Sequence, residues 1–155
     1  MGTGGYGLAL MAHLAGVVVW VGGMFFAYVV MRPTVVESLE GPPRLQFFLS
    51  AFSRFFRWVW LSVAVILLSG YAMIGLSGGM AGLPVHLHAM HGLGLLMAAL
   101  FVYLFVLPFK SLRAHVAAER WPEAAAALGR IRHIIAVNLT LGLITVLVGA
   151  SRGLI

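Results

Sequence analysis

The feature that most constrains this chain is a long stretch without any charged side chain. From residue 58 to residue 109 there is no Lys, Arg, Asp or Glu. Over the whole chain of 155 residues, 62% are hydrophobic and 9% are charged, whereas a soluble domain carries about 25% charged residues. Because a soluble fold of this size cannot cover its surface with so few charges, the composition predicts a single domain embedded in a lipid bilayer.

Composition also excludes several classes of function. The chain has no Cys, which rules out disulfides, zinc–thiolate sites, iron–sulfur clusters and thiol catalysis. It has no Asp, so a Ser-His-Asp triad is impossible, and no P-loop is present. The formal net charge is +6, but the basic residues lie in short connecting segments rather than on one face. Such clusters set membrane topology and contact headgroups, so nucleic acid is not an expected partner.

Four apolar runs predict an all-α protein with four transmembrane spans, at about residues 6–31, 55–76, 85–109 and 133–150. The N-terminal run is too long for a signal peptide and has no basic residue before it, so we expect a retained helix. The Arg-Pro pair at residues 32–33 is expected to end the first span. Residues 44–57, where Arg and Phe alternate, predict an amphipathic segment at the membrane interface. Short connections between spans favour an antiparallel four-helix bundle.

The basic residues predict an orientation for this bundle. The first connection carries Arg32, Arg44, Arg54 and Arg57, and the third carries Lys110, Arg113, Arg120, Arg130 and Arg132. The second carries none, and only Arg152 follows the last span. By the positive-inside rule, connections one and three are cytoplasmic. Both termini then lie on the outer, periplasmic side of a bacterial inner membrane.

Histidines gather at the predicted outer side. Residues 86–91 read HLHAMH and begin the third span, while His13 lies about two turns into the first span. An ionisable residue inside a span is costly and usually faces the bundle interior. On a helix, His88 and His91 share one face, and His86 and Met90 share another. We therefore expect His13 and part of the cluster to form a site at matched depth.

Two chemistries fit such a site. Haem b in a helical bundle is often held by His residues from two helices, here His13 with His88 or His91. Trp20 would line that pocket, and Asn138 would contact the cofactor edge or a quinone, unless Asn138 only makes an interhelical hydrogen bond. Copper is the alternative, because it takes imidazole and thioether ligands where thiolates are absent. Its predicted ligands are His13, His86, His88, Met90 and His91.

Three segments resemble the CopD-like membrane proteins. These are HLAGVVVWVGGMFFAYVVMRP at residues 13–33, RFFRWVWLSVAVILLSG in the second span, and RIRHIIAVNLTLGLITVLVGASRG in the last. The group is similar in layout to the HemJ haem-binding membrane proteins, which implies His13 as a haem ligand with His88 or His91 as its partner. The CopD name implies copper uptake instead. The chain lacks the Lys and the Glu-x-Pro element of HemJ, so porphyrinogen oxidation is not implied.

The favoured hypothesis is a haem b protein that carries out electron transfer or oxidation at the outer side of the membrane. It would be an oxidoreductase with a redox partner or a quinone. The alternative is a copper-binding or copper-transporting protein, and a scaffold without cofactor is a third hypothesis. Because four spans are few for a transport path, copper transport predicts a homo-oligomer.

Overall fold

The protein was analysed as a computed structural model, which describes residues 3–151. Nearly all of these residues are helical, and no strand occurs among them. The first long helix contains five consecutive segments: α1 (Thr3–Val17), η1 (Val18–Gly22), α2 (Gly23–Phe25), η2 (Phe26–Met31) and α3 (Arg32–Ser38). The remaining elements are α4 (Gly41–Leu76), η3 (Met80–Gly82), α5 (Val85–Leu104), η4 (Phe105–Phe109), α6 (Lys110–Ala117) and α7 (Trp121–Ala150).

Four continuous helical stretches are long and apolar enough to cross a membrane. They are Gly4–Ser38, Gly41–Leu76, Val85–Ala117 and Trp121–Ala150. Each exceeds the roughly 20 residues that a bilayer core requires. Large apolar side chains also lie on the outside of the molecule: Val85 is 85% exposed, Leu68 73% and Leu147 70%. Such a surface is stable in lipid and not in water, which confirms the prediction of an all-α, multi-pass membrane protein.

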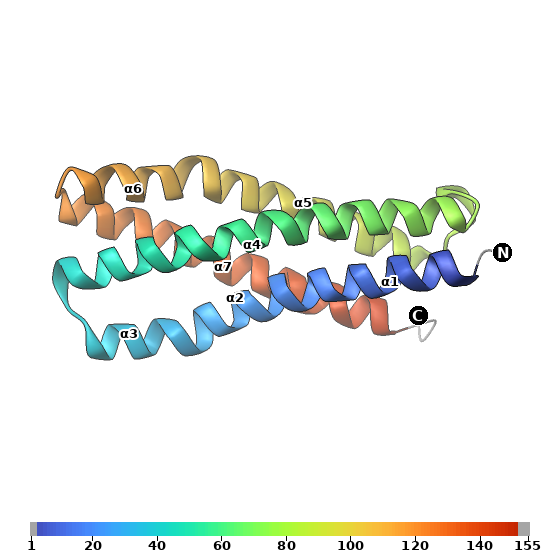
Figure 1. Ribbon diagram of the computed structural model, residues 1–155, viewed down its shortest axis with the longest axis horizontal. Coiled ribbons are helices and arrows are strands. Elements are labelled where there is room, and N and C mark those ends of the chain that lie inside the picture. The colour runs from blue at the N-terminus through green and yellow to red at the C-terminus, as the bar shows by residue number, and fades with distance from the viewer. Residues whose placement is uncertain (1–2, 152–155) are drawn as a thin grey trace.

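The long helices lie side by side along the length of the molecule (Figure 1). α1 packs along α4, while α5 and α6 pack along α7, and α4 also contacts α7. The labelled N and C ends lie at the same end of the molecule as the turn between α4 and α5 (Figure 1). The turns between α3 and α4 and between α6 and α7 lie at the opposite end (Figure 1).

The helices extend well beyond the apolar runs of the sequence. Arg32 and Pro33 do not end the first helix, which continues to Ser38. Pro33 lies directly after the π-helical segment η2, inside the continuous helical stretch Gly4–Ser38, where it removes one backbone donor without ending the helix. The first connection is therefore only Leu39 and Glu40. At this end, most charged side chains stand on helices rather than on loops.

The segment before the second apolar run contributes one of its faces to the core. It forms the start of α4, where Phe48, Phe52 and Phe56 recur every four residues and are all buried. The rings of Phe52 and Phe56 stack with centroids 5.3 Å apart. Phe56 also meets Phe109 edge-on at 4.9 Å. The phenylalanines share one helix face that packs inside the bundle, whereas Arg54 and Arg57 are exposed. The position of this segment at the membrane interface stays a prediction.

The uncharged second connection is a tight turn, as its glycine-rich sequence predicts. Gly78 and Gly79 have φ angles of 90° and 99°, in the region that favours glycine. Pro84 then precedes α5 with an extended backbone. This turn fixes the start of α5 and therefore the position of the histidine-rich residues 86–91.

Candidate functional site at the charge-free end

His13 is held by α4 rather than by α5. Its side chain is half-buried, and its Nδ1 lies 3.1 Å from the carbonyl oxygen of Ile66 and 3.1 Å from the hydroxyl oxygen of Ser69. The imidazole packs beside Gly70, where an added Cβ atom would be in ordinary van der Waals contact, 3.6 Å from Cε1 of His13. The ring is therefore fixed in orientation by two polar contacts on a neighbouring helix.

These contacts determine the protonation of the His13 ring. The Ser69 hydroxyl donates its hydrogen to the carbonyl of Val65, 2.6 Å away, so towards His13 it acts as an acceptor. The Ile66 carbonyl can only accept. His13 Nδ1 must therefore carry the hydrogen and donate to both, which leaves the lone pair of the neutral ring on Nε2. Histidines that bind metals are typically oriented in this way, with the second nitrogen donating to a carbonyl.

The HLHAMH segment occupies the first two turns of α5, and its side chains point in different directions. His88 is exposed, and its Nδ1 lies 3.3 Å from the carbonyl oxygen of Pro84, one turn earlier. Because that carbonyl is an acceptor, Nδ1 carries the hydrogen here too, and Nε2 is the free nitrogen. His86 is half-buried. At the exposed end of the cluster, Nε2 is therefore the ring nitrogen of His88 that is left for a ligand.

Met90 and His91 both face other helices. The His91 ring meets Tyr71 of α4 edge-on, with ring centroids 5.4 Å apart. Met90 packs against α7, where a Cβ atom added to Gly149 would come within 2.8 Å of its Cε and 3.0 Å of its sulfur. The glycine thus admits the thioether to the helix interface.

His13 and His91 lie at one level of the molecule, on different sides of α4. His13 contacts Ser69 and His91 contacts Tyr71, and residues two apart on an α-helix point about 200° away from each other. Within residues 3–151, no group of three or more His, Cys, Asp or Glu side chains is arranged to hold a metal ion. His13 and His91 therefore lie at a similar height along α4, but the predicted ligands do not converge on one point.

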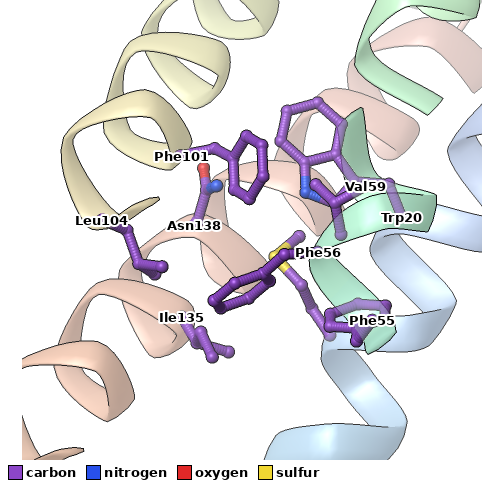
Figure 2. Close-up of a pocket in the computed structure, with 9 residues that line it drawn as sticks. Trp20, Phe55, Phe56, Val59, Phe101, Leu104, Ile135 and Asn138 are labelled. Atoms are coloured by element: carbon purple, nitrogen blue, oxygen red, sulfur yellow. The ribbon is translucent and has the colours of Figure 1, made fainter. Parts of the chain in front are cut away.

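Trp20 and Asn138, the other predicted cofactor contacts, line a small cavity at the centre of the bundle (Figure 2). Its volume is about 10 Å³. Asn138 is 3% exposed, and its Nδ2 donates a hydrogen bond of 3.3 Å to the carbonyl of Met97 on α5. Its Oδ1 is buried and has no hydrogen-bond partner among the described residues. The contact to Met97 is an interhelical hydrogen bond between α7 and α5.

This central packing does not fit a haem. A cavity of about 10 Å³ accommodates about one water molecule, whereas pockets for ligands of haem's class measure about 300–1,000 Å³. Trp20 packs edge-on against Phe101 with centroids 6.3 Å apart. Phe101, Phe56 and Leu104 also surround the cavity (Figure 2). A macrocycle between Trp20 and Asn138 would have to separate these side chains.

A larger cavity, of about 310 Å³, lies at the opposite end of the molecule. Three arginines from three different helices line it: Arg32 of α3, Arg44 of α4 and Arg132 of α7. From the sequence, these arginines predict only the orientation of the spans and contacts with lipid headgroups. Because they are far apart along the chain, no local spacing indicates that they share a cavity.

Comparison with known families gives one match. The family model described as copper resistance protein D (CopD) matches residues 49–152, which is more than half of the chain. The match includes His86, His88, Met90, His91 and Asn138, whereas His13 and Trp20 precede it. No curated protein and no solved structure matches the chain significantly.

Proposed function

Because the chain belongs to the CopD family, we propose that it is a copper-handling membrane protein. Its copper-binding groups would be the imidazoles of His13, His86, His88 and His91 and the thioether of Met90. They lie at the charge-free end, the end of the molecule where residues 3–151 carry no Lys, Arg, Asp or Glu. In the absence of cysteine, His and Met supply the soft and intermediate ligands that copper prefers. Copper would be the cargo of the protein rather than a resident cofactor.

One observation carries the proposal beyond the family name. The Nδ1–H of His13 is held by the Ile66 carbonyl and the Ser69 hydroxyl, and the Nδ1–H of His88 is held by the Pro84 carbonyl. In the neutral form of each ring, the lone pair therefore lies on Nε2. Neutral imidazoles of this tautomer bind metals without first losing a proton.

The exposure of the ligands suggests an order of contact with the ion. His88 is exposed, whereas His86, two residues earlier, and Met90 and His91, two and three residues later on α5, are half-buried. We propose that His88 receives copper first and that the half-buried groups take it towards the helix interfaces. His13 would act as a separate ligand on the other side of α4. A continuous path through the membrane would require more than one copy of the chain.

We further propose that this end faces the outer side of a bacterial inner membrane. Residues 1–155 would then form one antiparallel four-span domain with both termini outside. The opposite end carries the basic residues from Arg32 to Arg57 and from Lys110 to Arg132, which supports a cytoplasmic placement by the positive-inside rule. Among residues 3–151, no Lys or Arg at the histidine-bearing end would repel a copper ion.

Haem b is less well supported as the ligand of this site. The polar contacts of His13 are on α4 and not on α5, and the central cavity beside Trp20 is too small for a macrocycle. The oxidoreductase activity that was predicted with haem has no separate support. Copper handling is therefore the function we propose for this site, in place of electron transfer.

Copper(I) titration of the detergent-purified protein, in competition with a chromophoric copper(I) chelator, tests the proposal. We expect binding by the wild-type chain that weakens in His88→Ala and in His13→Ala. His133→Ala is the matched control, because His133 is an exposed imidazole in the first half of α7 and is not one of the predicted ligands. A wild-type chain that fails to compete for copper would refute the function. An absorption spectrum of protein from haem-replete cells tests haem independently, because a Soret band that shifts on reduction would restore that alternative.

A further inference from the structure

The cavity at the arginine-rich end has a composition that suits an anionic ligand. The cavity lies among α3, the start of α4 and the first half of α7. The turn from α3 to α4 and the start of α7 lie at the same end of the molecule (Figure 1). Arg32, Arg44 and Arg132 line it, and none of its lining residues is acidic. Three positive charges therefore share one space of about 310 Å³ without a carboxylate in its wall.

The arginines are partly withdrawn from the surroundings. Arg32 and Arg44 are half-buried, and Arg132 is exposed. The guanidinium carbon of Arg32 lies 5.7 Å from the centre of the Tyr28 ring, a cation–π contact that restrains its position. Partly desolvated cations gain stability from a counter-charge. The planar guanidinium pairs with phosphate oxygens through two parallel hydrogen bonds, which makes phosphate the best-matched anion.

The remaining wall of the cavity is apolar. It includes Leu45 and Phe48 of α4 together with Leu128 and Ile135 of α7. A small hydrated ion would not contact these apolar side chains, whereas an amphiphile would contact both the arginines and the apolar wall. The combination of an arginine cluster and an apolar wall at the end of membrane-spanning helices is typical of headgroup pockets between helices.

We propose that this cavity binds a phosphate-bearing anion, with the phosphate between Arg32, Arg44 and Arg132. The apolar wall favours an anionic phospholipid as its source, with an acyl chain along α4 and α7. A free phosphate compound offers the same oxygens to the same arginines and is the other source. This inference is independent of copper handling, because it involves neither the histidines nor the charge-free end.

Native mass spectrometry of the detergent-purified full chain can test the proposal. Three probes are titrated: phosphatidylglycerol, diacylglycerol with the same acyl chains, and inorganic phosphate. Phosphatidylglycerol should bind at least about fivefold more tightly than diacylglycerol, because one arginine near a membrane surface contributes roughly that factor. Diacylglycerol binding as tightly as phosphatidylglycerol would overturn the proposal.

Two variants identify the site. Arg132→Gln should weaken phosphatidylglycerol binding about fivefold, and Arg44→Gln should do the same. Arg130→Gln is the matched control, because Arg130 is exposed on the same helix and does not line the cavity. Since Arg132 is exposed, its replacement leaves the core intact, and the test stands even if the Arg44 variant does not fold. An equal loss in the Arg130 and Arg132 variants would mean general surface attraction and would refute the site.

Competition separates the two sources. If inorganic phosphate does not displace phosphatidylglycerol at millimolar concentration, the ligand is the lipid. If it displaces the lipid, and its effect disappears in Arg132→Gln, the cavity is a phosphate site that free compounds also occupy. Both outcomes support a phosphate-binding cavity.

Discussion

His13 on α1 and Ser69 on α4 are joined by a hydrogen bond of 3.1 Å, in which the imidazole Nδ1–H donates to the hydroxyl. The Ser69 hydroxyl is itself oriented by its bond to the carbonyl of Val65. The tautomer of His13 is therefore set by two acceptors on α4, the Ile66 carbonyl and the Ser69 hydroxyl, more than fifty positions away in the sequence. Copper binding at His13 should depend on α4 although α4 supplies no ligand.

Ser69→Ala tests that dependence. Removing the hydroxyl leaves the Ile66 carbonyl as the only acceptor for His13 Nδ1–H, so the ring loses one of its two restraints. We expect a loss of about 1 kcal/mol in the free energy of unfolding and weaker copper(I) binding, measured by thermal denaturation and chelator competition. Ser53→Ala is the control, because Ser53 also donates to the carbonyl four residues earlier on α4. Equal copper affinities in the two variants would contradict the role of Ser69.

Gly22 and Gly23, neighbours in the first long helix, provide a second test, which concerns helix packing. A Cβ atom at Gly23 would lie 2.4 Å from Cε2 and 2.7 Å from Cζ of Phe55, whereas at Gly22 it would meet nothing within 4 Å. Gly23→Ala should therefore cost about 1–3 kcal/mol through overpacking. Gly22→Ala should leave stability unchanged or raise it by up to about 1 kcal/mol, because Ala favours helix. Thermal denaturation in detergent measures both, and equal melting temperatures would argue against this helix contact.

Much of the fold can be predicted from the sequence, because the bilayer imposes strong rules. The four apolar runs indicate the helices, and the glycines at 78 and 79 indicate the turn. Helix ends are harder to predict, because α4 and α7 continue into charged segments whose helical structure depends on tertiary packing. Phe48 and Phe52 illustrate this, since their burial on α4 is visible only once the neighbouring helices are in place.

The depth of the candidate site along the helices could be predicted from the sequence, but the contacts of each side chain could not. Counting turns from each span end predicts a similar depth for His13 and His91, and both lie beside residues 69–71 of α4. Which side of α4 each contacts depends on helix rotation, which periodicity alone does not determine when the helices are apolar on every face. The arginine cavity was missed for a related reason, since it joins three helices that are distant in sequence.

Asn138 allows a structural role to be separated from a functional one. Its Nδ2 makes one bond of 3.3 Å and its Oδ1 has no partner among the described residues. Asn138→Leu keeps a similar volume and removes the buried unpaired oxygen, so we expect a change in stability below about 1 kcal/mol. Asn138→Asp would bury a charge and should destabilise strongly. If Asn138→Leu instead abolishes copper binding while the melting temperature is unchanged, Asn138 has a role beyond helix packing.

His91→Phe tests whether the half-buried part of the cluster binds copper. The His91 ring meets Tyr71 edge-on at 5.4 Å, and a phenyl ring can keep this contact while offering no nitrogen. We therefore expect the melting temperature to change little and the copper(I) affinity to fall by about tenfold, since one lost ligand contributes about 1.4 kcal/mol or more. Tyr71→Phe is the matched control, because it alters the same aromatic pair from the α4 side and removes no imidazole. If chelator competition gives wild-type affinity for both His91→Phe and His88→Ala, copper does not bind through His88 or His91, and His13, His86 and Met90 would remain as the predicted ligands.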